Sequence, residues 1–193
     1  MTDKSTEEAG KSGKTVHVRS ATPADAAATL AIYTPFVTDT VISFEETPPE
    51  LMEWRGRIQR AMGRLPWLVL EIDGVVRGYA YAGLHRARAA YRWSVDVSVY
   101  LAPDARRQGH GRRLYAALFS RLRALGYINA FAGVTLPNPG SVGLHEAMGF
   151  EPVGVYPAVG YKHGAWHDVG WWSLRLQEPD APPTEPRSAR HHG

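Results

Sequence analysis

The stretch RRQGHGRRLY, from Arg106 to Tyr115, places four arginines and two glycines directly before an apolar run with helical spacing. Gly109 and Gly111 let the backbone bend sharply and leave amide N–H groups open to a ligand. A helix that starts near Gly111 adds unpaired N–H groups and the positive end of its dipole. The stretch therefore predicts an anion site, and a solvated basic helix start is the alternative.

Two common phosphate loops do not fit this stretch. A P-loop needs lysine and a hydroxyl residue after its last glycine, but Gly111 is followed by Arg112 and Arg113. A dinucleotide fingerprint needs a third glycine where Leu114 stands. What remains is the pattern Arg-x-x-Gly-x-Gly, which begins at Arg106.

The segment before the loop, SVDVSVYL, alternates as a β-strand does. Side chains of odd-numbered residues from Val95 to Leu101 face one way, and Ser94, Asp96 and Ser98 face the other. A central strand covered on both faces is usually apolar throughout. The carboxylate of Asp96 therefore indicates either a functional acid or a sheet face that is open to solvent.

A second polar group lies in NPGSVGLHEAMGF. Asn138 follows an expected strand and precedes an expected helix, and His145 adjoins the apolar pair Leu144 and Met148. A histidine in this position is either packed in the core or part of a site.

The elements that must position these residues alternate along the chain. Strands are expected over 16–20, 67–72, 75–84, 93–101, 128–134 and around 154–161 and 168–176, and helices over 22–36, 48–62, 112–126 and 139–150. Thr22 and Pro23 form a helix start, Asp73 and Gly74 a two-residue hairpin turn, and Gly126 a helix end. This order predicts one α/β (α+β) domain, with a mixed sheet flanked by helices.

Composition bounds the remaining choices. The chain has no cysteine, so disulfides and thiolate metal sites are excluded, and its net charge of +3 is too small to suggest a nucleic-acid partner. Residues 1–14 and 178–193 are polar or proline-rich, so we expect disordered tails around a domain over 15–177. With no apolar run of membrane length and no signal-peptide core, we expect a cytoplasmic protein without a membrane partner. His163 and His167 have zinc spacing only on a helix, and Gly164 argues against one, so no metal is expected.

Together, the strand acid, the Arg-x-x-Gly-x-Gly loop and Asn-x-x-Ser-x-x-Leu-His-Glu resemble the GCN5-related N-acetyltransferase superfamily. Within it, the chain is similar to the phosphinothricin N-acetyltransferases and their relatives that acetylate methionine sulfoximine and methionine sulfone. The stretches TVISFEETP, PWLVLEIDGVVRGYAYAG, RARAAYRWSVDVSVYL and GYKHGAWHDVGWW extend this similarity from Thr40 to Trp172. The resemblance implies a mostly antiparallel sheet with splayed strands at an acetyl-CoA site, a small amino-acid substrate and a homodimer.

The resemblance also implies roles for individual residues. Residues expected to bind acetyl-CoA, the acetyl donor, are Val99, Tyr100, Leu101, Arg106, Arg107, Gln108, Gly109, His110, Gly111, Arg112 and Asn138. Residues expected around the amino acid are Phe44, Arg86, Arg88 and Tyr91. The paired arginines suit an acidic head group, although a solvated loop is the alternative for either one.

Asp96 stands where the family has a glutamate base, and His145 where it has an active-site histidine. Aspartate is one methylene shorter, a deficit of about 1.3–1.5 Å. We therefore expect Asp96 and His145 to share the role of general base. The competing interpretations are a non-catalytic acyl-CoA-binding module and an acetyltransferase for protein N-termini or polyamines; the retained acid and histidine disfavour the first, and the arginines disfavour polyamines.

Overall fold

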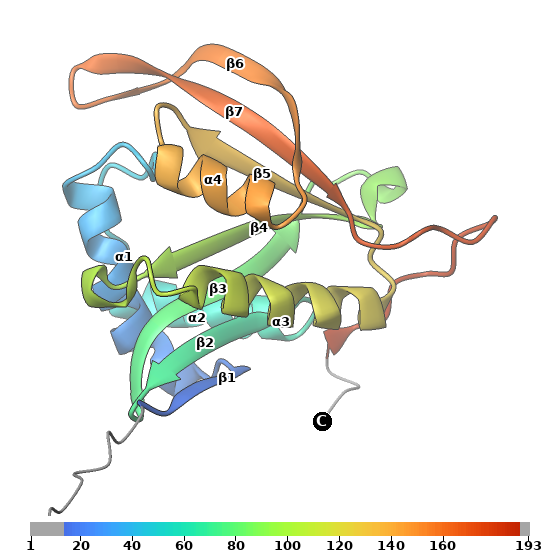
Figure 1. Cartoon of the computed structure of the whole chain (residues 1–193), viewed down its shortest axis with the longest axis horizontal. Coiled ribbons are helices and arrows are strands. Elements are labelled where there is room, and N and C mark those ends of the chain that lie inside the picture. The colour runs from blue at the N-terminus through green and yellow to red at the C-terminus, as the bar shows by residue number, and fades with distance from the viewer. Residues whose placement is uncertain (1–13, 190–193) are drawn as a thin grey trace, which may run out of the picture.

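The computed structural model describes residues 14–189, which form one sheet with helices on both faces (Figure 1). The seven strands of this part are β1 (Val16–Ser20), β2 (Trp67–Ile72), β3 (Val75–Leu84), β4 (Ser94–Leu101), β5 (Asn129–Thr135), β6 (Glu151–Lys162) and β7 (Ala165–Arg175). The four α-helices are α1 (Ala26–Thr38), α2 (Leu51–Met62), α3 (His110–Leu125) and α4 (Pro139–Ala147). The expected order of strands and helices is confirmed.

The predicted helix start, hairpin turn and helix end are found at the expected residues. Asp25 accepts a hydrogen bond from the backbone N–H of Thr22 at 2.7 Å, and a short 3₁₀ turn beginning at Pro23 leads into α1. Asp73 and Gly74 have positive φ angles of 51° and 78° in the turn between β2 and β3, as a type I′ hairpin turn requires. Gly126 ends α3 with a φ of 91°.

The sheet has the order β1-β2-β3-β4-β5-β7-β6. All neighbouring strands are antiparallel except β4 and β5. The parallel pair covers three residues only, Ser94–Asp96 of β4 against Asn129–Phe131 of β5. Beyond it, β4 stays paired with β3 as far as Leu101, while β5 follows β7. The two central strands therefore diverge, which confirms the expected splay.

Two apolar cores hold the helices against the sheet. On one face, α3 buries Leu114, Tyr115, Leu118 and Leu122 against strand residues that include Val95 and Val97. On the other face, α1 and α2 pack Phe36, Trp54 and Ile58 against residues such as Trp67 and Tyr79. Figure 1 shows α3 in front of the sheet with α1 and α2 behind it, and α4 beside β5.

The described part of the C-terminal segment, which is expected as a disordered tail, makes hydrogen bonds to the domain. The backbone N–H of Arg187 donates to the carbonyl of Leu125 at 2.7 Å, and Trp93 Nε1 donates to the carbonyl of Thr184 at 2.8 Å. These bonds attach the proline-rich segment to the end of α3 and to the residue before β4, without helix or strand pairing. The N-terminal tail lies outside the described residues except for Lys14, and the domain boundaries stay predictions.

Candidate active site

The Arg106–Gly111 loop has the geometry of an open helix start. Gly109 precedes α3 with a φ of 79°, a left-handed conformation that favours glycine. The first backbone bond of the helix runs from Arg113 N to Gly109 O at 3.1 Å, and the described residues provide no partner for the N–H groups of 107–112. A Cβ on Gly111 would lie 3.0 Å from Leu144 of α4, so the loop and α4 approach closely.

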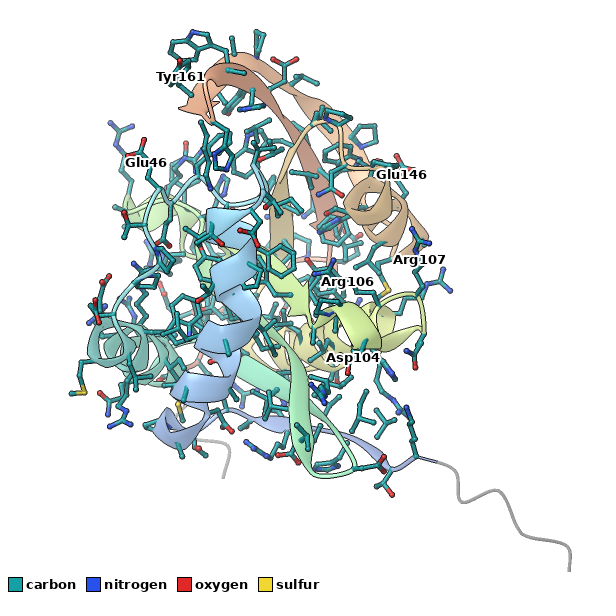
Figure 2. All side chains as sticks on the ribbon, turned by 90° about the vertical axis from the view of Figure 1, so that its left-hand side faces the viewer. Glu46, Asp104, Arg106, Arg107, Glu146 and Tyr161 are labelled. Carbon is teal, nitrogen blue, oxygen red and sulfur yellow. The ribbon has the colours of Figure 1, made fainter. Side chains whose placement is uncertain are left out.

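A groove of about 640 Å³ runs along this loop between α1, the end of β4 and α4. Figure 2 looks at this side, with α1 in front and Arg106 and Arg107 beside it. Ten of the eleven residues expected to bind acetyl-CoA line the groove: Val99, Tyr100, Leu101, Arg106, Arg107, Gly109, His110, Gly111, Arg112 and Asn138. Gln108 does not line it, because its side chain turns back and donates to the carbonyl of Asp104 at 2.7 Å.

Two members of the groove have local structural roles as well. Asn138 caps α4, since its Oδ1 accepts from the backbone N–H of Ser141 at 3.1 Å. Arg106 holds its guanidinium 5.0 Å from the ring centroid of Phe36 in α1 and donates to the carbonyl of Leu101 at 3.2 Å. Asn138 thus holds the start of α4, and Arg106 holds the loop against α1, at the two edges of the groove.

His145 is buried at the inner end of α4, with 3% of its surface exposed. Its Nδ1 lies 2.7 Å from the carbonyl oxygen of Ser141, which places the proton on Nδ1. Its Nε2 then accepts from the hydroxyl of Tyr115 at 2.9 Å. Burial lowers the pKa of His145, so the ring is held neutral. Both side chains line a cavity of about 60 Å³ between the diverging strands.

Tyr115 is a site residue that the sequence analysis did not identify. Its position fits the apolar stripe of α3, where an aromatic residue is expected to serve packing alone. Only the contact with His145, thirty residues away, distinguishes it.

Because His145 is neutral in the folded protein, we expect acid to lower the stability of the fold. Because its folded-state pKa is below the ordinary value of about 6.5, the unfolded chain binds more protons between these two values. The stabilisation is therefore fully present above about pH 6.5 and is lost as the pH falls towards the folded-state pKa. Thermal unfolding from about pH 8 to about pH 5 should show Tm falling more steeply in the wild type than in His145→Gln. Equal slopes would contradict this prediction.

Asp96 faces the opposite side of the sheet, and its partner is a residue that the sequence analysis missed. Asp96 Oδ1 lies 2.6 Å from His85 Nδ1. Burial raises the pKa of the Asp96 carboxyl, while the hydrogen bond from His85 and the charge of Arg86 act in the opposite direction. His85 directly follows β3, and β3 places Gly83 opposite Asp96. A signal was available, because β4 returns antiparallel along β3 and brings these positions together.

Asp96 and His145 do not meet on one face of β4. Val95 and Val97 pack in the core that contains Tyr115, the partner of His145. Asp96 lies between them in sequence and points the other way, as the strand alternation predicts. The two residues can therefore act on a common molecule only through the opening between β4 and β5.

The four residues expected around the amino acid are distributed unequally. Tyr91 contacts the His85 ring edge-on, with centroids 5.9 Å apart. Arg86 donates to the carbonyl of His85 at 2.8 Å, and its guanidinium carbon lies 5.8 Å from a ring of Trp171. Arg88 shares an outer hollow with Arg86 and with the C-terminal segment. Phe44 packs over Gly160 of β6, where a Cβ would lie 2.1 Å from its ring. The structure thus brings Arg86 and Tyr91 to the Asp96–His85 pair.

Within residues 14–189, no three or more His, Cys, Asp or Glu side chains cluster in a way that could hold an ion. His163 and Gly164 form the turn between β6 and β7, with φ angles of 49° and 78°. Among the same residues, no helix is long and apolar enough to cross a membrane.

Comparison with known proteins agrees with this geometry. The profile of the acetyltransferase (GNAT) family matches residues 30–150. Phosphinothricin N-acetyltransferase of Streptomyces viridochromogenes is 43% identical over 87% of this chain and 91% of its own length. The L-methionine sulfoximine/L-methionine sulfone acetyltransferase of Pseudomonas aeruginosa is 37% identical over 86% and 98%. The crystal structure of a GNAT superfamily phosphinothricin acetyltransferase from Sinorhizobium meliloti, in complex with AcCoA, is 39% identical and superposes with a TM-score of 0.83 over 89% of this chain and 92% of that one. The family that the sequence pattern resembles is therefore confirmed, and the chain belongs to the GNAT family of acetyltransferases.

Proposed function

We propose that this N-acetyltransferase transfers the acetyl group of acetyl-CoA to the α-amino group of a small amino acid with an acidic head, such as phosphinothricin. The observation that carries the proposal is the division of polar groups along β4. The groove with the glycine loop lies at the carboxyl end of β4, and Asp96, His85 and Arg86 gather nearer its amino end, where the pairing of β4 with β5 stops. Acetylation would block the amino group of a toxic analogue, which is a resistance function.

The groove supplies what a CoA thioester needs. The open N–H groups at the start of α3 and the arginines around them suit a pyrophosphate. Beyond Asp96, one edge of β4 has no strand partner in the described sheet, so backbone groups near Val99 can pair with an extended pantetheine arm. An N–H on the same edge can stabilise the oxyanion that forms when the amine attacks.

The Asp96 side supplies what an amine needs. An amino group arrives protonated, and only its neutral form can attack a thioester. A base must therefore remove a proton, directly or through a water molecule. Asp96 lies on this side of the opening, and Arg86 beside it provides a positive charge for the acidic head of the substrate.

His145 and Tyr115 act on the side of the donor. Both line the small cavity between the strands, and the Tyr115 hydroxyl can turn its proton from His145 Nε2 towards a thiolate in that cavity. We propose that the pair assists the leaving thiolate, whose pKa resembles that of cysteine, about 8.5. Such a leaving group needs little help, so the assistance contributes modestly.

The same geometry fits methionine sulfoximine and methionine sulfone, which are the substrates in the names of the relatives from Pseudomonas. These compounds carry an uncharged sulfur head in place of a phosphinate. Arg86 and Arg88 are cations at this end of the site and favour a substrate with a negative head group. We therefore expect faster turnover with phosphinothricin than with the uncharged sulfur compounds.

A thiol-release assay with acetyl-CoA and a panel of amines tests the proposal. We expect release with phosphinothricin and less release with methionine sulfone, and none with a polyamine. If none of the tested amines causes thiol release, the proposal would be overturned in favour of a non-catalytic acyl-CoA-binding module. Preference for a polyamine or a peptide N-terminus would overturn the substrate class.

Replacing Arg88 with alanine is expected to raise KM for phosphinothricin about tenfold or more, because a charge-assisted contact to an anion contributes roughly 1.5–3 kcal/mol. The side chain is exposed and lies in an outer hollow, so folding and the KM for acetyl-CoA should not change. Steady-state kinetics of Arg88→Ala beside Arg64→Ala, a second arginine of that hollow, make the comparison. An unchanged KM for phosphinothricin would show that the expected contact does not exist.

We also propose a homodimer that forms through the β6–β7 hairpin. This hairpin extends beyond the rest of the sheet (Figure 1), and six of its large apolar side chains are each about half exposed or more: Val153, Val155, Tyr156, Val159, Tyr161 and Trp166. Such a patch is typical of an interface. A second copy is the occupant, because the same apolar hairpin on each chain can form a self-complementary contact about a two-fold axis.

Light scattering during gel filtration checks the dimer. The wild type should elute with twice the chain mass, and Val155→Asp with Trp166→Glu should elute with the mass of one chain, because two buried charges are unfavourable at an apolar contact. Leu84→Asp, an exposed apolar position on β3, is the control. A monomeric wild type would refute the proposal. The cytoplasmic location stays a prediction.

A further inference from the structure

His85 lies where β4 and β5 separate. The last paired residues of the two strands are Asp96 and Phe131. His85 hydrogen-bonds the first through Nδ1 at 2.6 Å and stacks on the ring of the second, with centroids 4.3 Å apart and planes 20° apart. One imidazole therefore contacts both strands at the mouth of the opening through which donor and amine must meet.

The imidazole is held in one orientation. Tyr91 and Trp171 contact it edge-on at centroid distances of 5.9 and 6.2 Å, and 12% of its side chain is exposed. A carboxylate partner fixes the proton on Nδ1, which leaves the lone pair on Nε2. No residue among 14–189 makes a hydrogen bond to that Nε2. The charged groups around the ring are Asp96 of β4 and Arg86 of the following loop, and Tyr91 is the remaining titratable neighbour.

We infer that His85 Nε2 is the atom that accepts the proton of the substrate ammonium, and that Asp96 is the positioning residue that orients the ring. The inference rests on the proposed function. It also gives a role to an aspartate where the family resemblance implies a glutamate. The shorter carboxylate keeps its bond to His85, and the ring carries the accepting atom beyond it towards the opening.

The step balances as follows. His85 Nε2 takes one proton from the ammonium, and the nitrogen lone pair attacks the carbonyl carbon of the thioester. The new C–N bond replaces the C–S bond, whose electron pair leaves with sulfur. The second proton of the nitrogen passes to the thiolate, and His85 returns its own proton to water. The products are the N-acetyl amino acid and free CoA thiol.

Kinetics of His85→Gln and His85→Ala test the role of the ring. We expect kcat/KM for the amino acid to fall about 10²–10⁴-fold, the usual contribution of general base catalysis, while the KM for acetyl-CoA stays unchanged. His17→Gln, an exposed histidine on β1, is the matched control and should keep full activity. Circular dichroism melting shows whether each variant folds. An active wild type beside a folded His85→Gln of equal activity would overturn this inference alone, whereas a wild type inactive with every amine would overturn the proposed function.

Chemical rescue separates proton transfer from space filling. Free imidazole should restore part of the activity of His85→Ala, and a series of substituted imidazoles should restore more activity as their basicity rises. A rescue that does not depend on basicity would mean that the ring only fills space, and this result would overturn the inference.

A double-mutant cycle tests the coupling to Asp96. If the two residues form one unit, Asp96→Asn should cost little in the His85→Ala background, although it is costly in the wild type. Losses that multiply would show independent residues and would overturn the orienting role of Asp96.

Discussion

Asp96→Asn is expected to lower kcat/KM for the amino-acid substrate by about 10²–10⁴-fold while acetyl-CoA binding stays unchanged. Asparagine has the size of aspartate but no charge, and its amide cannot hold the His85 imidazole as the carboxylate does at 2.6 Å. The groove for the donor lies at the carboxyl end of β4 and does not include Asp96. The loss should therefore fall on turnover of the amine.

Thiol-release kinetics and calorimetric titration of acetyl-CoA measure the two effects separately. Asp180→Asn, an exposed carboxylate in the C-terminal segment, is the control and should behave as the wild type. His145→Ala is the companion variant, for which we expect a smaller fall in turnover. Normal turnover in both Asp96→Asn and His145→Ala would refute the assignment of the site.

Trp54→Ala is expected to lower the free energy of unfolding by about 3–5 kcal/mol, the usual cost of truncating a buried tryptophan. Trp54 is 2% exposed, stacks on Tyr33 at a centroid distance of 4.8 Å and donates to Thr29 Oγ1 at 2.9 Å. Removing its ring leaves a cavity between α1 and α2 and deprives the Thr29 hydroxyl of its donor.

The substitution should also weaken the segment that carries Phe44. Tyr33, which loses its stacking partner, bonds the hydroxyl of Ser43 at 2.6 Å and the carboxylate of Glu45 at 3.0 Å. We therefore expect Tm to fall by roughly 10 °C, at about 2–4 °C per kcal/mol for a domain of this size, together with a rise in KM for the amine. Met52→Ala on the same helix, 71% exposed, should leave both values unchanged. A tryptophan variant as stable as the methionine variant would contradict the packing argument.

Periodicity and turn residues predicted most of the fold. The alternation in SVDVSVYL assigned each side chain of β4 to its face, and Val95 and Val97 are buried while Asp96 is only partly buried. Asp73 with Gly74 marked one hairpin correctly. The same kind of signal at His163 and Gly164 lies in the turn between β6 and β7, where Gly164 already argued against a zinc site on a helix.

The features that local sequence patterns did not reveal depend on contacts between separate segments. The separation of β4 from β5 was expected only from the family resemblance, because it follows from the different partners of each strand, which no local pattern encodes. His85 becomes part of the site because β4 returns along β3 and places Asp96 beside it. Lys162 is buried because its ammonium donates to the carbonyls of Val37 and Ser43, more than a hundred residues away.

The separation of the two groups of residues along β4 has a consequence for how such a protein can diversify. Residues that receive the donor lie along the α3 loop and α4, and residues near the incoming amine come from the end of β3 and the loop after it. Since few side chains belong to both groups, the amine side can accumulate substitutions while donor handling is inherited intact. Single amino-acid substitutions around His85 and Arg86 can then change which amine is acetylated, while the transfer chemistry stays the same.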